Sequence, residues 1–90
     1  PKVNKTIWIF HGAGGQFASG VFETKELAEA WITKNDLQGG LTRYPVNVGV
    51  YDWAIESGFF QPKSESQEQP EFIQKFTSAA MEHYHYEKED

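Results

Sequence analysis

Two histidines lie two residues apart near the end of the 90-residue sequence, His83 and His85 in EHYHY. On a β-strand, residues two apart point to the same side, so both imidazole rings can approach one metal ion. A third protein ligand would be needed, and His11 and Glu82 are the candidates. Because two histidines alone are a weak metal signal, we predict no bound metal and no cofactor. A pH-responsive pair is a further option, since histidine titrates near neutrality.

The same segment also fits an edge strand of a β-sheet. Residues 81–86 alternate in the period of a pleated strand, with histidines on one side and tyrosines on the other. In this interpretation Tyr84 and Tyr86 pack inward while the histidines face water. We therefore expect a docked strand over residues 81–86. Residues 87–90 are all charged, have nothing to bury, and are expected to form a solvated end.

A glycine-rich stretch, HGAGG at residues 11–15, follows a predicted strand. Loops of this kind donate backbone N–H groups to an oxyanion in lipase-like enzymes. However, the sequence has no G-x-S-x-G motif for a nucleophile, and no Lys-Ser/Thr pair follows for a phosphate-binding loop. Because glycine tolerates positive φ, a hairpin turn explains the composition by itself.

Asp52 and Glu56 are spaced i,i+4 and would share one side of a helix. Paired carboxylates can perform acid–base chemistry when one of them is buried, but such a pair more often forms a solvated face. We therefore predict no catalytic residues and favour a protein that is not an enzyme. The alternative is a small metal- or ligand-dependent enzyme that uses His11, His83 and His85.

A single small domain is predicted over residues 1–90, because this length supports one core. The sequence has no cysteine, which excludes thiolate metal sites and favours a cytoplasmic setting. The net charge is −5 and Arg43 is the single arginine, so we expect no nucleic-acid partner. No apolar run approaches the roughly 20 residues of a membrane helix, so we expect no membrane partner.

The order of the elements predicts an α+β fold with a small antiparallel sheet that begins with a β-hairpin. Thr6–Gly12 is rich in β-branched and aromatic residues. Both of its faces are apolar, which indicates a central strand. Residues 17–23 read as the returning strand of the hairpin.

The main helix is predicted over about residues 24–35. Thr24 can cap the N–H groups of the first turn, and Asn35 with the following QGG ends the helix. Lys25 and Glu29 are spaced i,i+4, and we expect this pair on the outer side. The apolar face carries Leu27, Ala28, Ala30, Trp31 and Ile32.

The middle of the chain is less regular. Residues 41–48 predict a short edge strand, because Tyr44 precedes Pro45 and is pushed out of the helical region. Residues 48–57 fit a strand or a helix, and we favour a short helix that ends at Gly58.

Residues 61–71 contain no apolar side chain besides two prolines, which is typical of a polar surface loop. A second short helix is predicted after it. Pro70 suits the first turn of this helix, and Phe72, Ile73 and Phe76 share one of its faces.

Several longer phrases of the sequence resemble a family of small bacterial proteins known only as a domain of unknown function. The phrases are WIFHG, FASGVF, AEAWI, LTRYPVNVGVYDWAI, GFF and FTSAAMEHYHYE. Together they cover nearly the whole chain, and no single phrase carries a known chemistry. The resemblance implies a compact α+β domain, free-standing or appended to other domains, and it brings no catalytic residues to this chain.

The chain has fourteen aromatic residues, more than a small core can hide. We expect some of the following side chains to be partly exposed, and all five are candidates for contact with a partner: Trp53, Phe59, Phe60, Tyr84 and Tyr86. A larger core, completed by a homodimer, is the alternative. The sequence therefore predicts a non-enzymatic binding or regulatory module whose partner is a protein or a second copy of the chain.

Overall fold

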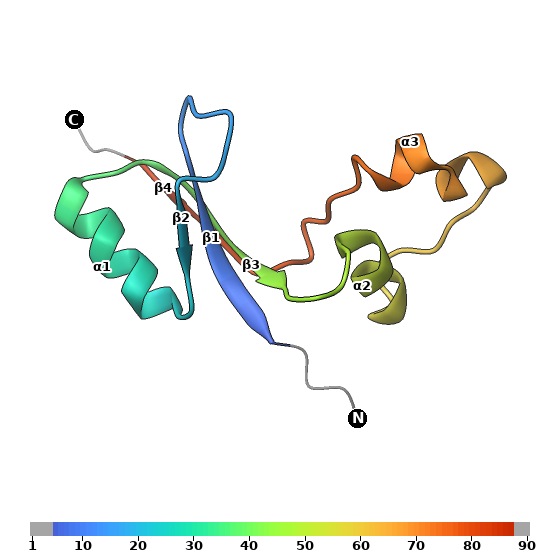
Figure 1. Ribbon diagram of the computed structural model, residues 1–90, viewed down its shortest axis with the longest axis horizontal. Coiled ribbons are helices and arrows are strands. Elements are labelled where there is room, and N and C mark those ends of the chain that lie inside the picture. The colour runs from blue at the N-terminus through green and yellow to red at the C-terminus, as the bar shows by residue number, and fades with distance from the viewer. Residues whose placement is uncertain (1–4, 88–90) are drawn as a thin grey trace.

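The computed structural model describes residues 5–87, which fold into a four-stranded antiparallel sheet and short helices (Figure 1). In chain order the elements are β1 (Thr6–Gly12), β2 (Gly20–Phe22), α1 (Lys25–Asn35), β3 (Gly39–Pro45), α2 (Val50–Glu56), the 3₁₀ helix η1 (Glu65–Glu68), α3 (Pro70–Ile73) and β4 (His83–Tyr86). The strand order is β2-β1-β3-β4. The predicted α+β class is confirmed. Of the predicted solvated end, Glu87 is exposed and residues 88–90 lie outside the described part.

β1 lies in the interior of the sheet, as its apolar residues predicted. Phe10 points to the side that α1 covers and is only 1% exposed. The register places Leu41 of β3 opposite Phe10, and Leu41 is fully buried. The other face of the sheet is more open, because Ile9 there is half-buried and its neighbour Val21 on β2 is 58% exposed.

β2 is shorter than the predicted strand over residues 17–23. Residues 13–19 form a wide loop instead, and Phe17 in this loop is 80% exposed. The strand begins at Gly20, where a Cβ atom would lie 2.7 Å from the ring of Phe22 and 3.1 Å from the ring of Trp31. Glycine at this position lets the rings pack closely against the strand.

α1 begins and ends through its flanking residues. The side chain of Thr24 accepts a hydrogen bond of 3.1 Å from the N–H of Leu27, which confirms the predicted cap. The helix ends at Asn35, as predicted, and its C-cap is Asp36, which has a left-handed φ of 54°, rather than one of the glycines that follow. The N–H of Leu37 then donates to the carbonyl of Ile32 at 3.0 Å, closing the last turn.

The face of α1 that meets the sheet differs from the prediction. Ala28 and Ile32 are buried, but Leu27 is 56% exposed. Lys25 and Glu29, expected on the outer side, turn instead toward tyrosines of β4. That expectation was wrong because the contacts are made with a distant segment: Glu29 and Tyr86 are 57 residues apart, and local periodicity carries no information over that distance.

β3 is an interior strand between β1 and β4, not the edge strand that was predicted. It begins at Gly39, whose φ is 152°. A Cβ atom there would lie 2.3 Å from the carbonyl oxygen of His11, so only glycine permits this close approach of β3 to β1. At the neighbouring Gly40, a Cβ atom would meet nothing within 4 Å.

The chain leaves the sheet after β3 and returns at β4. Between them lies what we call the aromatic lobe, residues 50–76, which contains α2, η1 and α3 (Figure 1). The helix favoured for residues 48–57 is confirmed: α2 ends at Glu56, Ser57 is its C-cap, and Gly58 follows with a φ of 81°. Most of the polar stretch 61–71 is exposed, but η1 and the first residues of α3 fall within it.

The molecule is extended, with principal dimensions of 46 × 32 × 18 Å. Its radius of gyration is 15.0 Å, whereas a compact domain of this length has about 12 Å. The compact shape implied by the resemblance is therefore not found, because the sheet with α1 and the aromatic lobe lie side by side (Figure 1). Among residues 5–87, no helix has both the length and the apolar character needed to cross a membrane.

Candidate functional site

The three histidines lie on the open face of the sheet, opposite α1. His85 of β4 and His11 of β1 flank Gly40 of β3 in one row across the sheet, and His83 pairs with Thr42 one row further on. All three histidine side chains are exposed. The Nε2 atom of His11 lies 3.2 Å from the carbonyl oxygen of Gly15 in its own loop.

The histidines do not form a three-ligand cluster. Within the described residues, no group of three His, Cys, Asp or Glu side chains is placed to hold a metal ion. His83 and His85 do lie together, with ring centroids 5.5 Å apart. His11 stands apart from them across β3.

The two tyrosines of β4 point the other way, toward α1. The ring of Tyr84 lies 6.0 Å from that of Trp8, and the Nζ atom of Lys25 lies 3.8 Å from its centre. The hydroxyl of Tyr86 donates to a carboxylate oxygen of Glu29 at 2.6 Å. Both tyrosines are half-buried and already hold β4 to the rest of the sheet.

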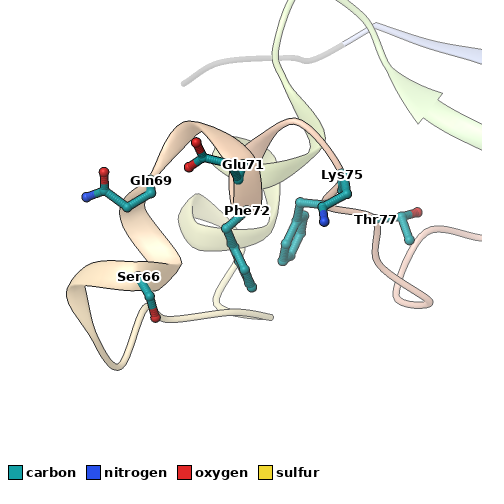
Figure 2. A pocket seen from close by; sticks show the side chains of 7 residues that line it. Ser66, Gln69, Glu71, Phe72, Lys75 and Thr77 are labelled. Carbon is teal, nitrogen blue, oxygen red and sulfur yellow. The ribbon is translucent and has the colours of Figure 1, made fainter.

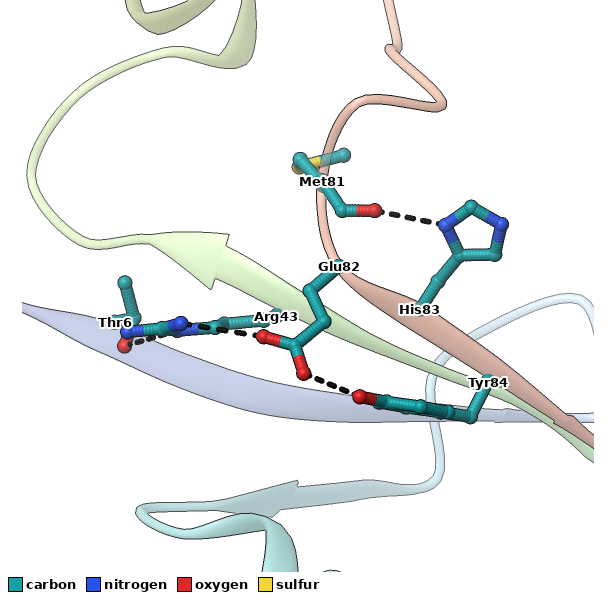
Figure 3. A network of polar contacts seen from close by, with 6 residues as sticks. All are labelled: Thr6, Arg43, Met81, Glu82, His83 and Tyr84. Carbon is teal, nitrogen blue, oxygen red and sulfur yellow. Dashed lines mark hydrogen bonds and ion pairs between the residues drawn. The ribbon is translucent and has the colours of Figure 1, made fainter.

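A polar network ties the ends of three strands together (Figure 3). Arg43 donates to Oγ1 of Thr6 at 2.9 Å and to Oε1 of Glu82 at 3.2 Å. The hydroxyl of Tyr84 donates to the other carboxylate oxygen of Glu82. Sequence reasoning treated Arg43 only as a lone arginine and missed this role, because its partners lie 37 and 39 residues away.

The pKa values in this network follow from the shared hydrogen bonds. The bond from Tyr84, followed by contacts with Arg43, keeps the pKa of Glu82 below its ordinary value. The same bond raises the pKa of Tyr84 above 10.0, and desolvation adds to it. The shared hydrogen bond therefore favours the ionised carboxylate of Glu82 and the neutral hydroxyl of Tyr84.

The remaining sequence candidates for chemistry lie far from one another. Residues 11–15 form part of the loop between β1 and β2, and Gly14 there has a positive φ of 82°. Asp52 and Glu56 are exposed on α2, in the other lobe.

Rings gather in the aromatic lobe. One cluster consists of Tyr51 and three phenylalanines, Phe60, Phe72 and Phe76. The centroids of these four rings lie 4.8 to 6.3 Å apart. Tyr51 is buried, and its hydroxyl donates to the carbonyl of Gln67 at 2.8 Å. Because several short segments share these rings, the cluster holds the lobe together.

This cluster stays open to the outside. A shallow hollow of about 730 Å³ lies beside α3, and Phe72 points into it from the helix (Figure 2). The hollow is lined by Ser66, Gln69, Glu71, Phe72, Lys75, Phe76 and Thr77.

The predicted contact residues of this lobe lie on another of its sides. Phe59 is 58% exposed, and its ring lies 5.4 Å from that of half-buried Trp53. Phe60 belongs to the cluster and lines a second hollow together with Phe59. The spacing of Phe72 and Phe76 after Pro70 predicted that these rings share one face, but it did not indicate that they line a hollow.

Comparison with known proteins places the chain in a family but gives no activity. No curated protein and no solved structure matches it. One family model matches residues 7–90, nearly the whole sequence, and its description is "Domain of unknown function (DUF7710)". The chain therefore belongs to the DUF7710 family of domains of unknown function.

Proposed function

We propose that the protein is a non-enzymatic binding module and that its aromatic lobe binds an apolar segment of a protein partner. The observation that carries this proposal is the open ring cluster beside α3. Phe72 and Phe76 line a wide hollow while remaining half-buried. Half-exposed rings in a depression are typical anchor sites of protein interfaces.

The charge of the lobe indicates the kind of partner. Residues 50–76 carry five acidic residues and two lysines, a net charge of −3. Glu71 and Lys75 stand at the hollow itself. A partner segment with an apolar anchor and basic flanking residues would complement this surface, because opposite potentials favour encounter and register.

The shape of the molecule supports the same function. The aromatic lobe extends away from the sheet (Figure 1), and its exposed Phe59 faces solvent. Because burial of apolar surface is favourable, a partner that covers the exposed apolar surface of this lobe would stabilise the complex.

A displayed library of random peptides tests the proposal, because it samples many candidate partner segments at once. We expect the wild type to enrich peptides that have an apolar centre and basic flanks. Ser66→Arg, which adds a cation beside the hollow and removes no ring, should abolish this enrichment. Phe17→Ser is the matched control, because Phe17 is 80% exposed but lies in the loop after β1.

Two results would contradict the proposal. One is enrichment of the same peptides on Ser66→Arg. The other is loss of enrichment on Phe17→Ser, which would move the binding surface to the sheet. Circular dichroism of each variant establishes that the fold is retained.

A further inference from the structure

We propose that His83 and His85 chelate one divalent transition-metal ion, such as Zn²⁺ or Cu²⁺, on the open face of the sheet. Both side chains are exposed and project from the same face of β4. Imidazole nitrogen is a preferred ligand of both ions. This site is independent of the aromatic lobe and does not rest on the proposed function.

The spacing of the two rings suits a shared ion. Their centroids lie 5.5 Å apart and their planes are inclined by 83°. Two imidazoles bound to one tetrahedral ion, with metal–nitrogen bonds of about 2 Å, have ring centres about 5 Å apart. The observed separation of the two rings is therefore compatible with one shared ion.

One of the rings is already prepared for coordination. The Nδ1 atom of His83 lies 2.7 Å from the carbonyl oxygen of Met81 (Figure 3). A carbonyl can only accept, so Nδ1 carries the proton and the neutral ring keeps a lone pair on Nε2. A hydrogen bond from the second nitrogen to a carbonyl is the usual way in which proteins orient a metal-binding histidine.

The surroundings leave room for the ion and its water. His83 and His85 line a shallow hollow of about 240 Å³ together with Thr42 and Tyr44 of β3 and with residues of the segment 77–81, which are small or polar except for Met81. No lysine or arginine is among the residues that line it, so no fixed positive charge opposes a cation there.

The ion would have two protein ligands. In the described part of the chain, no third His, Cys, Asp or Glu is close enough to complete a site. The nearest histidine in the same row of the sheet as His85 is His11, which is separated by Gly40 and directed to the carbonyl of Gly15. Water would fill the remaining coordination positions.

Titration calorimetry of the tag-free protein with zinc chloride tests the site. We expect one Zn²⁺ per chain, and a Kd at least tenfold weaker in His83→Ala and in His85→Ala. His11→Ala is the control and should bind within twofold of the wild type. With Cu²⁺, electron paramagnetic resonance should show nitrogen couplings from two imidazoles.

Two results would contradict the proposed metal site. Wild-type affinity in the His83→Ala/His85→Ala double variant would overturn the proposal. So would a tenfold loss in His11→Ala, because the ion would then sit elsewhere or need a third ligand. The substituted side chains are exposed, and circular dichroism establishes folding before each titration.

Discussion

The sheet and the aromatic lobe both collect aromatic rings, but they bury them to different degrees. In the sheet, Phe10 and Leu41 are almost completely enclosed beneath α1. In the aromatic lobe, the buried residues among 50–76 are Tyr51 and Ala54, and the other rings of the cluster are half-exposed. The sheet with α1 therefore has a closed core, whereas the core of the aromatic lobe is open to solvent.

The origin of the contacts explains this difference. The sheet core joins segments that are distant in sequence, as in the contact of Trp8 with Tyr84. The cluster of the aromatic lobe joins segments within residues 50–76, and its α-helices have seven and four residues. Helices this short are not stable alone. The lobe therefore depends on its rings, and part of their surface stays exposed.

The largest effect is expected from removal of β4. Truncation after Ala80 deletes buried Met81 and the two tyrosines that pack on the α1 side. We expect a loss of more than about 5 kcal/mol in the free energy of unfolding, close to the total stability of a small domain. Truncation after Tyr86 should change it little, because Glu87 is exposed. Chemical denaturation measures both, and equal stabilities would refute the structural role of β4.

A matched pair of ring deletions compares the two lobes directly. Phe10→Ala should cost about 3–5 kcal/mol, because it empties an enclosed position. Phe72→Ala should cost only about 1–2 kcal/mol, because the ring is half-exposed. Urea unfolding curves give both values. Equal losses would mean that the aromatic lobe has a closed core in solution.

The bond between Tyr86 and Glu29 predicts a dependence on alkaline pH. Burial, then the hydrogen bond and the charge of Glu29, raises the pKa of Tyr86 far above 10.0. The stabilisation is therefore complete below pH 10 and is lost as the pH rises further toward the folded-state pKa. Tyr86→Phe should lower the free energy of unfolding by about 1 kcal/mol at neutral pH. In this variant the free energy of unfolding should also fall less steeply above pH 10 than in the wild type. An unchanged alkaline profile in thermal unfolding would contradict this.

The smallest effect is expected in the polar stretch 61–71. Replacement of this stretch by a Gly/Ser linker should cost about 1 kcal/mol, chiefly because a flexible linker no longer holds the backbone carbonyl of position 67 where η1 places it, and the bond from the Tyr51 hydroxyl is lost. Tyr51→Phe should cost a similar amount. The two changes should not add in a double-mutant cycle, because they remove the same bond. Full additivity would show that the stretch contributes through other contacts.

Local patterns predicted much of the fold. Three features follow from residues that are close together in the sequence: the bounds of β1, the Thr24 cap of α1 and the end of α2 just before Gly58. In these cases the signal and the structure are close together in sequence.

Contacts between distant segments could not be predicted in this way. Which strands pair decides that β3 lies in the interior of the sheet. It also decides that the side chains of Lys25 and Glu29 are directed toward β4. The same holds for the candidate sites. Alternation placed His83 and His85 on one face, but it gave neither the contact of His83 with the Met81 carbonyl nor the hollow beside α3.

The position of the aromatic lobe between β3 and β4 has a kinetic consequence. β4 pairs with β3 only after the chain has closed a long loop, and the entropic cost of closure rises with loop length, by about 0.6 kcal/mol per doubling. A folded lobe shortens the effective loop, because its two ends then emerge close together. Early collapse of the ring cluster would therefore speed the docking of β4, and the lobe would assist the folding of a sheet to which it adds no strand.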